Sequence, residues 1–391
     1  MSFQDKLKLA VIPLLHTFTC PSPLSTSYPI ISIAVQNNET LATYLTYFEA
    51  CEEEHARARH QERMQRARAG GKARALPKQG GQRISREWLS GLSSQDAQSR
   101  FHLRADEIFE MLDALDIEED ILTRSRYKFS GLEALCLMLA CFRSSGELSQ
   151  LAMLYNRSPS TISEIVNYIV LYIDERWWHL LEFDHAHLLS PENLVAYASA
   201  IHHAGAPLEG KWQRQAYSGY KHYHALKFQA IMLPNGLFGH LFGPYESCHH
   251  DPFLLSESQI VDKCAEYATR PGTNDHTPAE QRFLQIFGDP AYGVSHQVVC
   301  PFGSENRTEE QTEWNATMLN VRIEVEHGFG LVLNTWPFLN SFWKMRVYGS
   351  PVGAYYRVGV LFTNILNCLR PNQVSQRFDL EPPLLKEYLY D

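Results

Sequence analysis

The stretch from residue 223 to 243, YHALKFQAIMLPNGLFGHLFG, decides the fold. Its first half alternates and is rich in strand-forming residues, which favours a β-strand. Pro234, Asn235 and Gly236 form a turn signal, and the apolar run from Leu237 indicates a second strand. We therefore expect a β-hairpin at this point of the chain.

The segment from 101 to 181, upstream of this hairpin, has helical periodicity throughout. Residues 106–115 form one short amphipathic stretch, and Ser130 is placed to cap a second helix. Trp177 and Trp178 are expected to close the core of this helical region.

A helix-turn-helix order is predicted within that region. Residues 148–155 form a short helix, residues 156–158 form a tight turn, and Pro159 opens a long helix behind a Ser158 cap. In such a unit the second helix enters the major groove of DNA with its N-terminus first. The residues that this would direct at DNA are Arg157, Ser160, Thr161, Ser163 and Asn167. The alternative is an ordinary helical hairpin, because the long helix has no Arg or Lys before Arg176.

Downstream of the hairpin, strand-like and helical segments follow one another. We expect a helix over 252–266, a strand over 282–289, a long helix over 313–329 and a final helix over 355–369. This order predicts an α/β layer fold after an N-terminal all-helical region. The expected parts are an N-terminal helix and basic linker, partly disordered, a helical domain, an α/β domain and a tail, with bounds 1–99, 100–190, 191–375 and 376–391.

The charge of the chain is divided unevenly. The whole chain carries −9, whereas residues 57–86 hold ten Arg or Lys and one acid. This basic arm, which begins in a helix expected over 39–68, could neutralise phosphates or act as a nuclear-import signal. A solvated linker is the alternative.

Several classes of protein are disfavoured by the composition. The eight cysteines include no C-x-x-C pair, which argues for a reducing intracellular compartment and against a structural zinc site. No window approaches about 18 uninterrupted apolar residues, so no membrane association is expected. No phosphate-binding glycine loop or nucleophile elbow supports a soluble metabolic enzyme.

Two carboxylates stand where phosphodiester chemistry would need them. Asp289 follows an apolar strand, and Glu326 shares a helix face with Arg322, four positions earlier, whereas Glu324 points elsewhere. With a third carboxylate, such a pair can hold two divalent ions that activate water. Hard oxygen ligands select Mg²⁺ or Mn²⁺. The alternative is that Asp289 is a turn residue and Glu326 is ion-paired to Arg322.

Three ordered motifs carry a family resemblance. These are YSGYKHYHALKFQAIMLPNGLFGHLFGPYESCHHD at 217–251, GDPAYG at 288–293 and VRIEVEHGFG at 321–330. Together they resemble the DDE superfamily endonucleases derived from PIF/Harbinger transposons, over about residues 100–370. The resemblance implies a helical domain followed by an RNase H-like nuclease fold that acts on DNA in the nucleus, together with a separate Myb-like partner protein. It also implies that Asp289 and Glu326 bind metal, and Asp251 matches a further Asp of the family.

The chain departs from the family pattern near residues 208–211. Family members carry a strand that ends in the first catalytic Asp. This strand and its Asp are missing here, in a gap of about twenty residues. Glu209 lies between Leu208 and Gly210 with no apolar strand before it, and does not replace that Asp. Either a genuine deletion or a dropped exon would explain the gap. We therefore expect an inactive nuclease, with a non-catalytic DNA- or protein-binding module as the alternative reading.

Other polar residues of the hairpin region have two interpretations each. Lys221 and Lys227 could contact phosphate or lie on a solvated strand face. The histidines of this region could converge on a metal or be ordinary strand and surface residues, and two of them, His249 and His250, could line the site beside Asp251. The four are His222, His224, His249 and His250.

Overall fold

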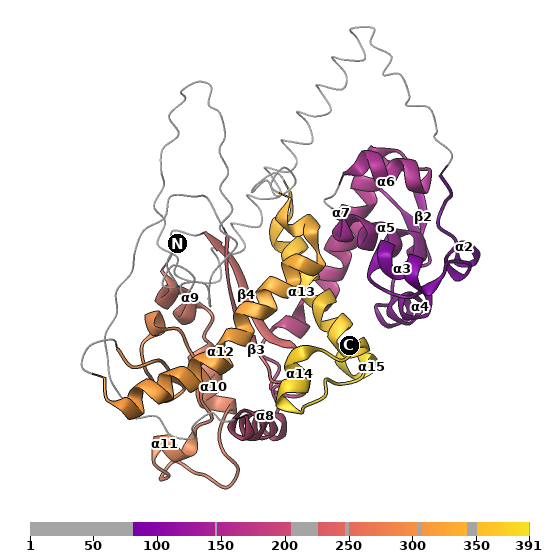
Figure 1. Cartoon of the computed structure of the whole chain (residues 1–391). Coiled ribbons are helices and arrows are strands. Elements are labelled where there is room, and N and C mark those ends of the chain that lie inside the picture. Colours follow the sequence, from indigo (N-terminus) through magenta and orange to yellow (C-terminus); the bar gives the residue numbers. More distant parts are fainter. Residues whose placement is uncertain are drawn as a thin grey trace, which may run out of the picture. The chain divides into compact units, whose positions relative to one another are not determined.

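A computed structural model describes residues 81–144, 147–204, 226–246, 250–303, 307–341 and 350–390. These residues belong to one compact unit of the chain, coloured by sequence in Figure 1. The helix expected over 39–68, most of the basic arm and the gap at 208–211 lie outside the described residues. No helix among the residues described is long and apolar enough to cross a bilayer.

The described residues upstream of residue 205, 81–144 and 147–204, are mainly helical. Their elements are α2 (Arg86–Ser90), α3 (Ser94–Phe101), α4 (Ala105–Ala114), β1 (Asp120–Leu122), β2 (Lys128–Ser130), α5 (Gly131–Arg143), α6 (Leu148–Tyr155), α7 (Pro159–Trp177), the 3₁₀ helix η2 (Trp178–Leu181) and α8 (Pro191–His203). The predicted helices of this region are confirmed. The antiparallel pair β1–β2 between α4 and α5 is an addition that periodicity did not predict.

Helix ends in this region follow the predicted capping residues. Ser130 accepts a hydrogen bond from the backbone N–H of Glu133 at the start of α5. Ser158 caps α7 in the same way, with Pro159 in its first turn. Asn156 ends α6 in a left-handed conformation, which a short polar side chain tolerates well. The local sequence therefore fixes the α6–turn–α7 connection.

Downstream of residue 225 short strands alternate with helices. The elements are β3 (Leu226–Met232), β4 (Phe238–Glu246), α9 (Asp251–Glu257), α10 (Ile260–Tyr267), α11 (Ala279–Arg282), β5 (Ile286–Phe287), η3 (Pro290–Tyr292), β6 (Val298–Val299), α12 (Glu309–Thr335), η4 (Pro337–Asn340), α13 (Val352–Leu369), α14 (Gln373–Phe378) and α15 (Leu385–Tyr388). Strands β3 and β4 form the predicted antiparallel hairpin, with Ala230 opposite Leu241.

Two predicted elements differ from the structure. The helix expected over 252–266 is broken into α9 and α10 because Gln259 adopts a left-handed conformation with φ of 52°. The strand expected over 282–289 is reduced to β5, because Arg282 ends the short helix α11 and Phe283 makes only an isolated bridge with Thr269. The helix expected over 313–329 extends at both ends to give α12.

The strands of the described residues form three separate two-stranded sheets. Two of these sheets are antiparallel, and β5 pairs with β6 in parallel. This mixture of helices and small sheets agrees with the predicted α/β class. The RNase H-like sheet and the predicted domain boundaries stay predictions.

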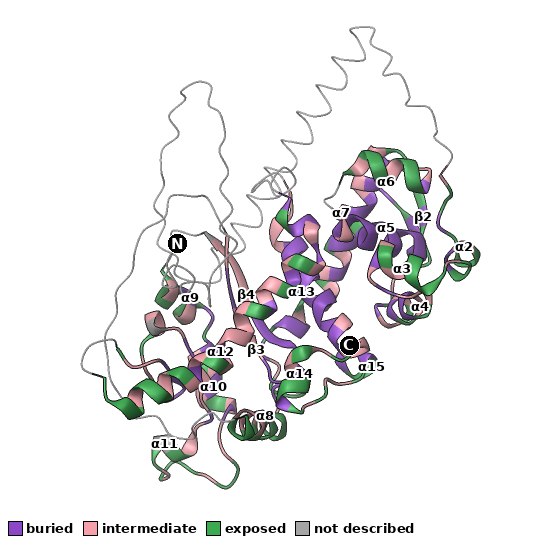
Figure 2. Ribbon diagram, in the orientation of Figure 1, coloured by how far each residue is buried: buried purple, intermediate pink, exposed green. Residues whose placement is uncertain are grey.

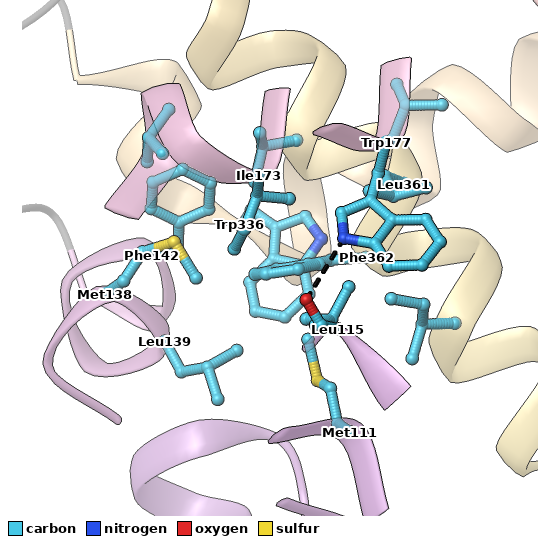
Figure 3. Close-up of a cluster of buried hydrophobic side chains, with 14 of the residues drawn as sticks. Met111, Leu115, Met138, Leu139, Phe142, Ile173, Trp177, Trp336, Leu361 and Phe362 are labelled. Atoms are coloured by element: carbon cyan, nitrogen blue, oxygen red, sulfur yellow. Dashed lines mark hydrogen bonds between the residues drawn. The ribbon is translucent and has the colours of Figure 1, made fainter. Parts of the chain in front are cut away.

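Aromatic residues from helices far apart in sequence form the centre of the core. Figure 2 shows α5 as largely buried, whereas α7 is buried along one face, and α13 shares the same cluster. The rings of Phe142 in α5, of Trp336 just after α12 and of Phe362 in α13 have centroids 5.9 to 6.4 Å apart. Trp177 donates a hydrogen bond of 3.3 Å to the carbonyl of Leu115 (Figure 3). Burial of such side chains is the main stabilising contribution to folding.

The expectation for the tryptophan pair holds for one of the two residues. Trp177 is buried, whereas the side chain of Trp178 is 48% exposed at the start of η2. The five described cysteines are free thiols, and four of them are buried. The segment predicted as a tail also contributes buried residues, Leu385 and Tyr388 of α15.

Asparagine side chains fasten the β3–β4 hairpin to the C-terminal helices. Asn364 is fully buried, accepts a hydrogen bond from the N–H of Phe238 and donates one to its carbonyl, both of 2.9 Å. Asn367 donates to the carbonyl of Gly236, and Asn372 donates to that of Asn235. These amides satisfy backbone groups that the two-stranded sheet leaves unpaired, and so fix the hairpin in place.

We expect Asn364→Ala to lower the free energy of unfolding by about 3 kcal/mol, because the N–H and C=O of Phe238 would stay buried without partners. Chemical denaturation of the full chain measures this loss. Asn320 is exposed on α12, so Asn320→Ala is a matched control that should change stability by less than about 0.5 kcal/mol. Equal stability of the two variants would contradict the role of Asn364 in fastening the hairpin.

Candidate functional site

Asp289 lies in a turn directly after β5, as the sequence predicts. Its Oδ1 accepts a hydrogen bond of 3.0 Å from the N–H of Ala291, which lies in η3. Gly288 before it packs so tightly on β6 that a Cβ there would lie 2.7 Å from Val298. The Cys300 thiol donates to the carbonyls of Asp289 and Gly293, each at 3.1 Å. The turn therefore holds the carboxylate in a defined position.

Arg322 of α12 lies between the two predicted carboxylates. Its Nη1 is 3.4 Å from Asp289 Oδ2, and its Nη2 is 3.9 Å from Glu326 Oε1. The Arg322 side chain is 5% exposed, against 23% for Asp289 and 21% for Glu326. A buried cation thus faces two half-buried anions. The alternative interpretation is also met, since Asp289 is a turn residue and Glu326 is ion-paired to Arg322. The predicted convergence of Asp289 and Glu326 is also observed.

Burial governs the protonation of Glu326. It raises the pKa of the Glu326 carboxyl above its usual value, and the negative charge of Asp289 acts in the same direction. The positive charges of Arg322 and His327 oppose this rise. The positive charge of Arg322 therefore favours the ionised form of Glu326.

Glu324 is separated from this group, as predicted. Its carboxylate pairs with Arg377 of α14 and contacts His327 on its own helix. The R-x-x-x-E spacing selects one glutamate of the two because residues four apart share a helix face.

Asp251 opens α9 and pairs with Lys227 of β3 at 3.0 Å. Helix α9 packs against η3, the 3₁₀ turn that follows Asp289. Burial raises the pKa of Tyr292 in that turn, and the charges of both Asp251 and Asp289 add to the rise. The structure therefore brings Asp251 to the same region as Asp289, with Tyr292 close to both.

Sequence reasoning missed the buried polar atoms around these carboxylates. The Tyr292 hydroxyl, Gln229 Oε1 and Arg322 Nε are buried and have no hydrogen-bond partner within the described part of the chain. Gln229 lies near Tyr292, but the pair does not reach hydrogen-bond geometry. The tyrosine of the GDPAYG motif could have indicated that Tyr292 lies beside the carboxylates, whereas nothing in the sequence indicated Gln229.

The donor set fits only part of the metal centre that the resemblance implies. Asp289 and Glu326 offer hard oxygen atoms that suit Mg²⁺ or Mn²⁺. A two-ion centre needs a further carboxylate, and no group of three or more His, Cys, Asp or Glu that could hold a metal occurs among the residues described. Asp251, the remaining candidate, is already paired with Lys227. The described residues therefore suit one divalent ion at most.

The residues predicted to face DNA fall into two groups. Arg157 is largely buried, binds both oxygens of Glu133 at 2.8 and 2.5 Å, and stacks on the Phe129 ring. Thr161 is buried at the N-terminus of α7, and Asn167 is engaged by the hydroxyl of Tyr355. These residues position the helices, and their contact with DNA would require rearrangement.

Ser160 is exposed and Ser163 is half-buried, so both are accessible, and their contact with DNA stays a prediction. Lys227 is committed to Asp251 in this structure. Lys221, His222, His224 and His249 lie outside the described residues, and His250 is exposed before α9.

Comparison with known proteins supports one assignment. Residues 203–351 match the family model described as DDE superfamily endonuclease. The match includes Lys227, Asp251, Asp289, Arg322 and Glu326, so the carboxylates described above lie within the segment that is similar to the DDE superfamily endonucleases. No curated protein and no solved structure matched the chain significantly.

We expect Arg322→Met to lower the free energy of unfolding by roughly 2 kcal/mol, because Asp289 and Glu326 would face each other without a counter-charge. Millimolar Mn²⁺ should raise the melting temperature of this variant more than that of the wild type, since the ion can replace the lost cation.

Arg282→Met is the control, because its ion pair with Asp275 is largely exposed and should contribute less than about 1 kcal/mol. A thermal unfolding series with and without Mn²⁺ measures both effects. Identical Mn²⁺ responses in Arg322→Met and wild type would show that Arg322 does not balance these carboxylates.

Proposed function

We propose that the chain carries a transposase-derived nuclease domain of PIF/Harbinger type that recognises DNA but no longer cleaves it. The observation that carries this proposal is the approach of Asp289 and Glu326 from a strand end and a helix, on either side of Arg322, within the DDE superfamily endonuclease match. DNA phosphodiesters are the substrate class that such a domain addresses.

Loss of cleavage follows from the charges available at the site. A divalent ion, Mg²⁺ or Mn²⁺, would supply charge neutralisation at a phosphate, and Asp289 and Glu326 would hold it. Lys227 and Arg322 compensate two of the three negative charges of Asp251, Asp289 and Glu326. The remaining charge is too small for two divalent ions. The absence of the first family Asp near residues 208–211 supports the same conclusion from the sequence.

The residues that remain can still orient a nucleic acid. The Arg322 guanidinium is paired with Asp289 and Glu326, and the Lys227 ammonium is paired with Asp251. A phosphate approaching this region would meet Lys227, whose side chain is 18% exposed, rather than the buried Arg322. Binding without hydrolysis is the behaviour that these pairs favour.

Several finer features belong to the same proposal. We propose an RNase H-like arrangement for residues 191–375, with Asp251 as an accessory carboxylate. Helices α6 and α7 would form the helix-turn-helix of the 100–190 domain and bind DNA through Ser160 and Ser163. A nuclear location and a separate Myb-like partner protein complete the proposal, and both rest on the family resemblance.

A non-catalytic binding module is the second candidate function. The basic arm at 57–86 favours it, since ten cations against one acid would neutralise phosphates and release counterions. Salt-sensitive DNA binding that survives Asp289→Ala but is lost when the arginines of the arm are neutralised would support this module.

We expect the purified full chain to leave supercoiled plasmid intact with Mg²⁺ or Mn²⁺, because a two-ion centre cannot form. Asp289→Ala should show the same background, and plasmid nicking followed on gels measures both. Metal-dependent nicking by the wild type that disappears in Asp289→Ala would overturn the proposed loss of cleavage.

A further inference from the structure

The β1–β2 hairpin carries a basic tip whose sequence is TRSRYK at residues 123–128. Its turn is closed by hydrogen bonds between backbone groups, from Thr123 N–H to the Tyr127 carbonyl at 3.0 Å and from Arg126 N–H to the Thr123 carbonyl at 2.8 Å. The Thr123 hydroxyl accepts a further bond from the Tyr127 N–H. The tip is therefore an ordered turn.

This tip is fastened beside the N-terminal half of α7. The N–H of Ser125 donates a hydrogen bond of 2.7 Å to the carboxylate of Glu164. Arg157, just before α7, donates to the carbonyl of Lys128 at 3.1 Å. Glu164 is four positions from the exposed Ser160, so both lie on one face of the helix. The hairpin tip and the exposed start of α7 thus form one continuous surface.

The cations of the tip differ from most others in the described structure. Arg124, Arg126 and Lys128 are all exposed, and no ion pair involves them in the described part of the chain. Nine other Arg and Lys residues are in ion pairs with carboxylates: Arg104, Arg157, Arg176, Lys227, Arg282, Arg322, Arg357, Arg370 and Arg377.

Acidic residues near the tip offset only part of its charge, since Glu164 supplies one negative charge against three positive ones. Glu164 is committed to the Ser125 N–H, and the exposed acids Glu118, Glu119 and Asp120 lie at the opposite end of the hairpin. An apolar ring accompanies the cations, since the Tyr127 side chain is 39% exposed. Exposed, ordered cations beside an aromatic ring suit a polyanion, because long Arg and Lys side chains reach phosphates at little cost in desolvation.

We propose that the β1–β2 tip binds the phosphate backbone of double-stranded DNA alongside α7. This inference rests on the proposed function for its choice of polyanion, and adds a contact surface outside the residues matched to the endonuclease family. The tip sets the position of the duplex against α7, and the contacts are independent of base sequence.

The test measures DNA affinity of the full chain as a function of salt. Fluorescence anisotropy with a random-sequence 30-base-pair duplex compares wild type with Arg124→Gln/Arg126→Gln. Each lost phosphate contact lowers the slope of log K against log salt by about 0.9, so the double variant should lose about two in slope and roughly 10- to 100-fold in affinity at low salt.

Two further variants separate charge from structure. Arg307→Gln/Lys386→Gln removes the same charge from exposed positions away from the hairpin and should leave the slope within error of wild type. Arg124→Lys/Arg126→Lys keeps the charge and should retain most of the affinity. Circular dichroism melting confirms that each variant is folded.

The outcomes distinguish this inference from the function on which it rests. A wild type that binds DNA, with an unchanged slope in Arg124→Gln/Arg126→Gln, overturns the hairpin contact alone. Equal losses in the hairpin and Arg307→Gln/Lys386→Gln variants also overturn it, since net charge would then explain the effect. A wild type without salt-dependent DNA binding overturns both this contact and the DNA-directed function.

Discussion

The position of the Arg322 guanidinium between Asp289 and Glu326 is the constraint on which the site depends. Two carboxylates that are about one-fifth exposed repel each other, and burial raises the pKa of Glu326. A cation between them relieves the repulsion and opposes the rise in the pKa of Glu326. This cation belongs to the chain itself and offsets one of the two negative charges. That arrangement suits binding better than two-ion chemistry.

The rest of the fold holds these charged side chains close to one another. Asn364 and Asn367 fasten the β3–β4 hairpin to α13, so Lys227 of β3 is positioned to pair with Asp251. Helix α12 carries Arg322 and Glu326 and also packs on β3 and α13. The carboxylates are therefore supported by buried amide contacts and by helix packing rather than by a wide central sheet.

The sequence predicted those features that depend on local physics. The Ser158 cap, the first-turn Pro159 and the PNG turn of the hairpin all rest on contacts within a few residues. The break between α9 and α10 was missed because Gln259 is not a residue type that commonly takes a positive φ. The short β5 was also misjudged, since strand-forming composition cannot show where a partner strand ends.

Tertiary pairs mark the limit of what the sequence could predict for the site. The carboxylates Asp289 and Glu326 were recognisable from motif and spacing, and the structure brings them together through Arg322. The pair of Lys227 with Asp251 joins residues 24 positions apart and has no local signature. The exposed cations of the β1–β2 tip were visible as TRSRYK, but their place beside α7 required the Ser125 contact with Glu164.

The number of Mn²⁺ ions bound by the full chain tests the central claim most directly. Electron paramagnetic resonance titration of free Mn²⁺ should find at most one ion per chain that depends on Asp289, because Arg322 and Lys227 already compensate most of the charge. That ion should be lost in Asp289→Ala. Two bound ions per chain, both lost in Asp289→Ala, would contradict the account.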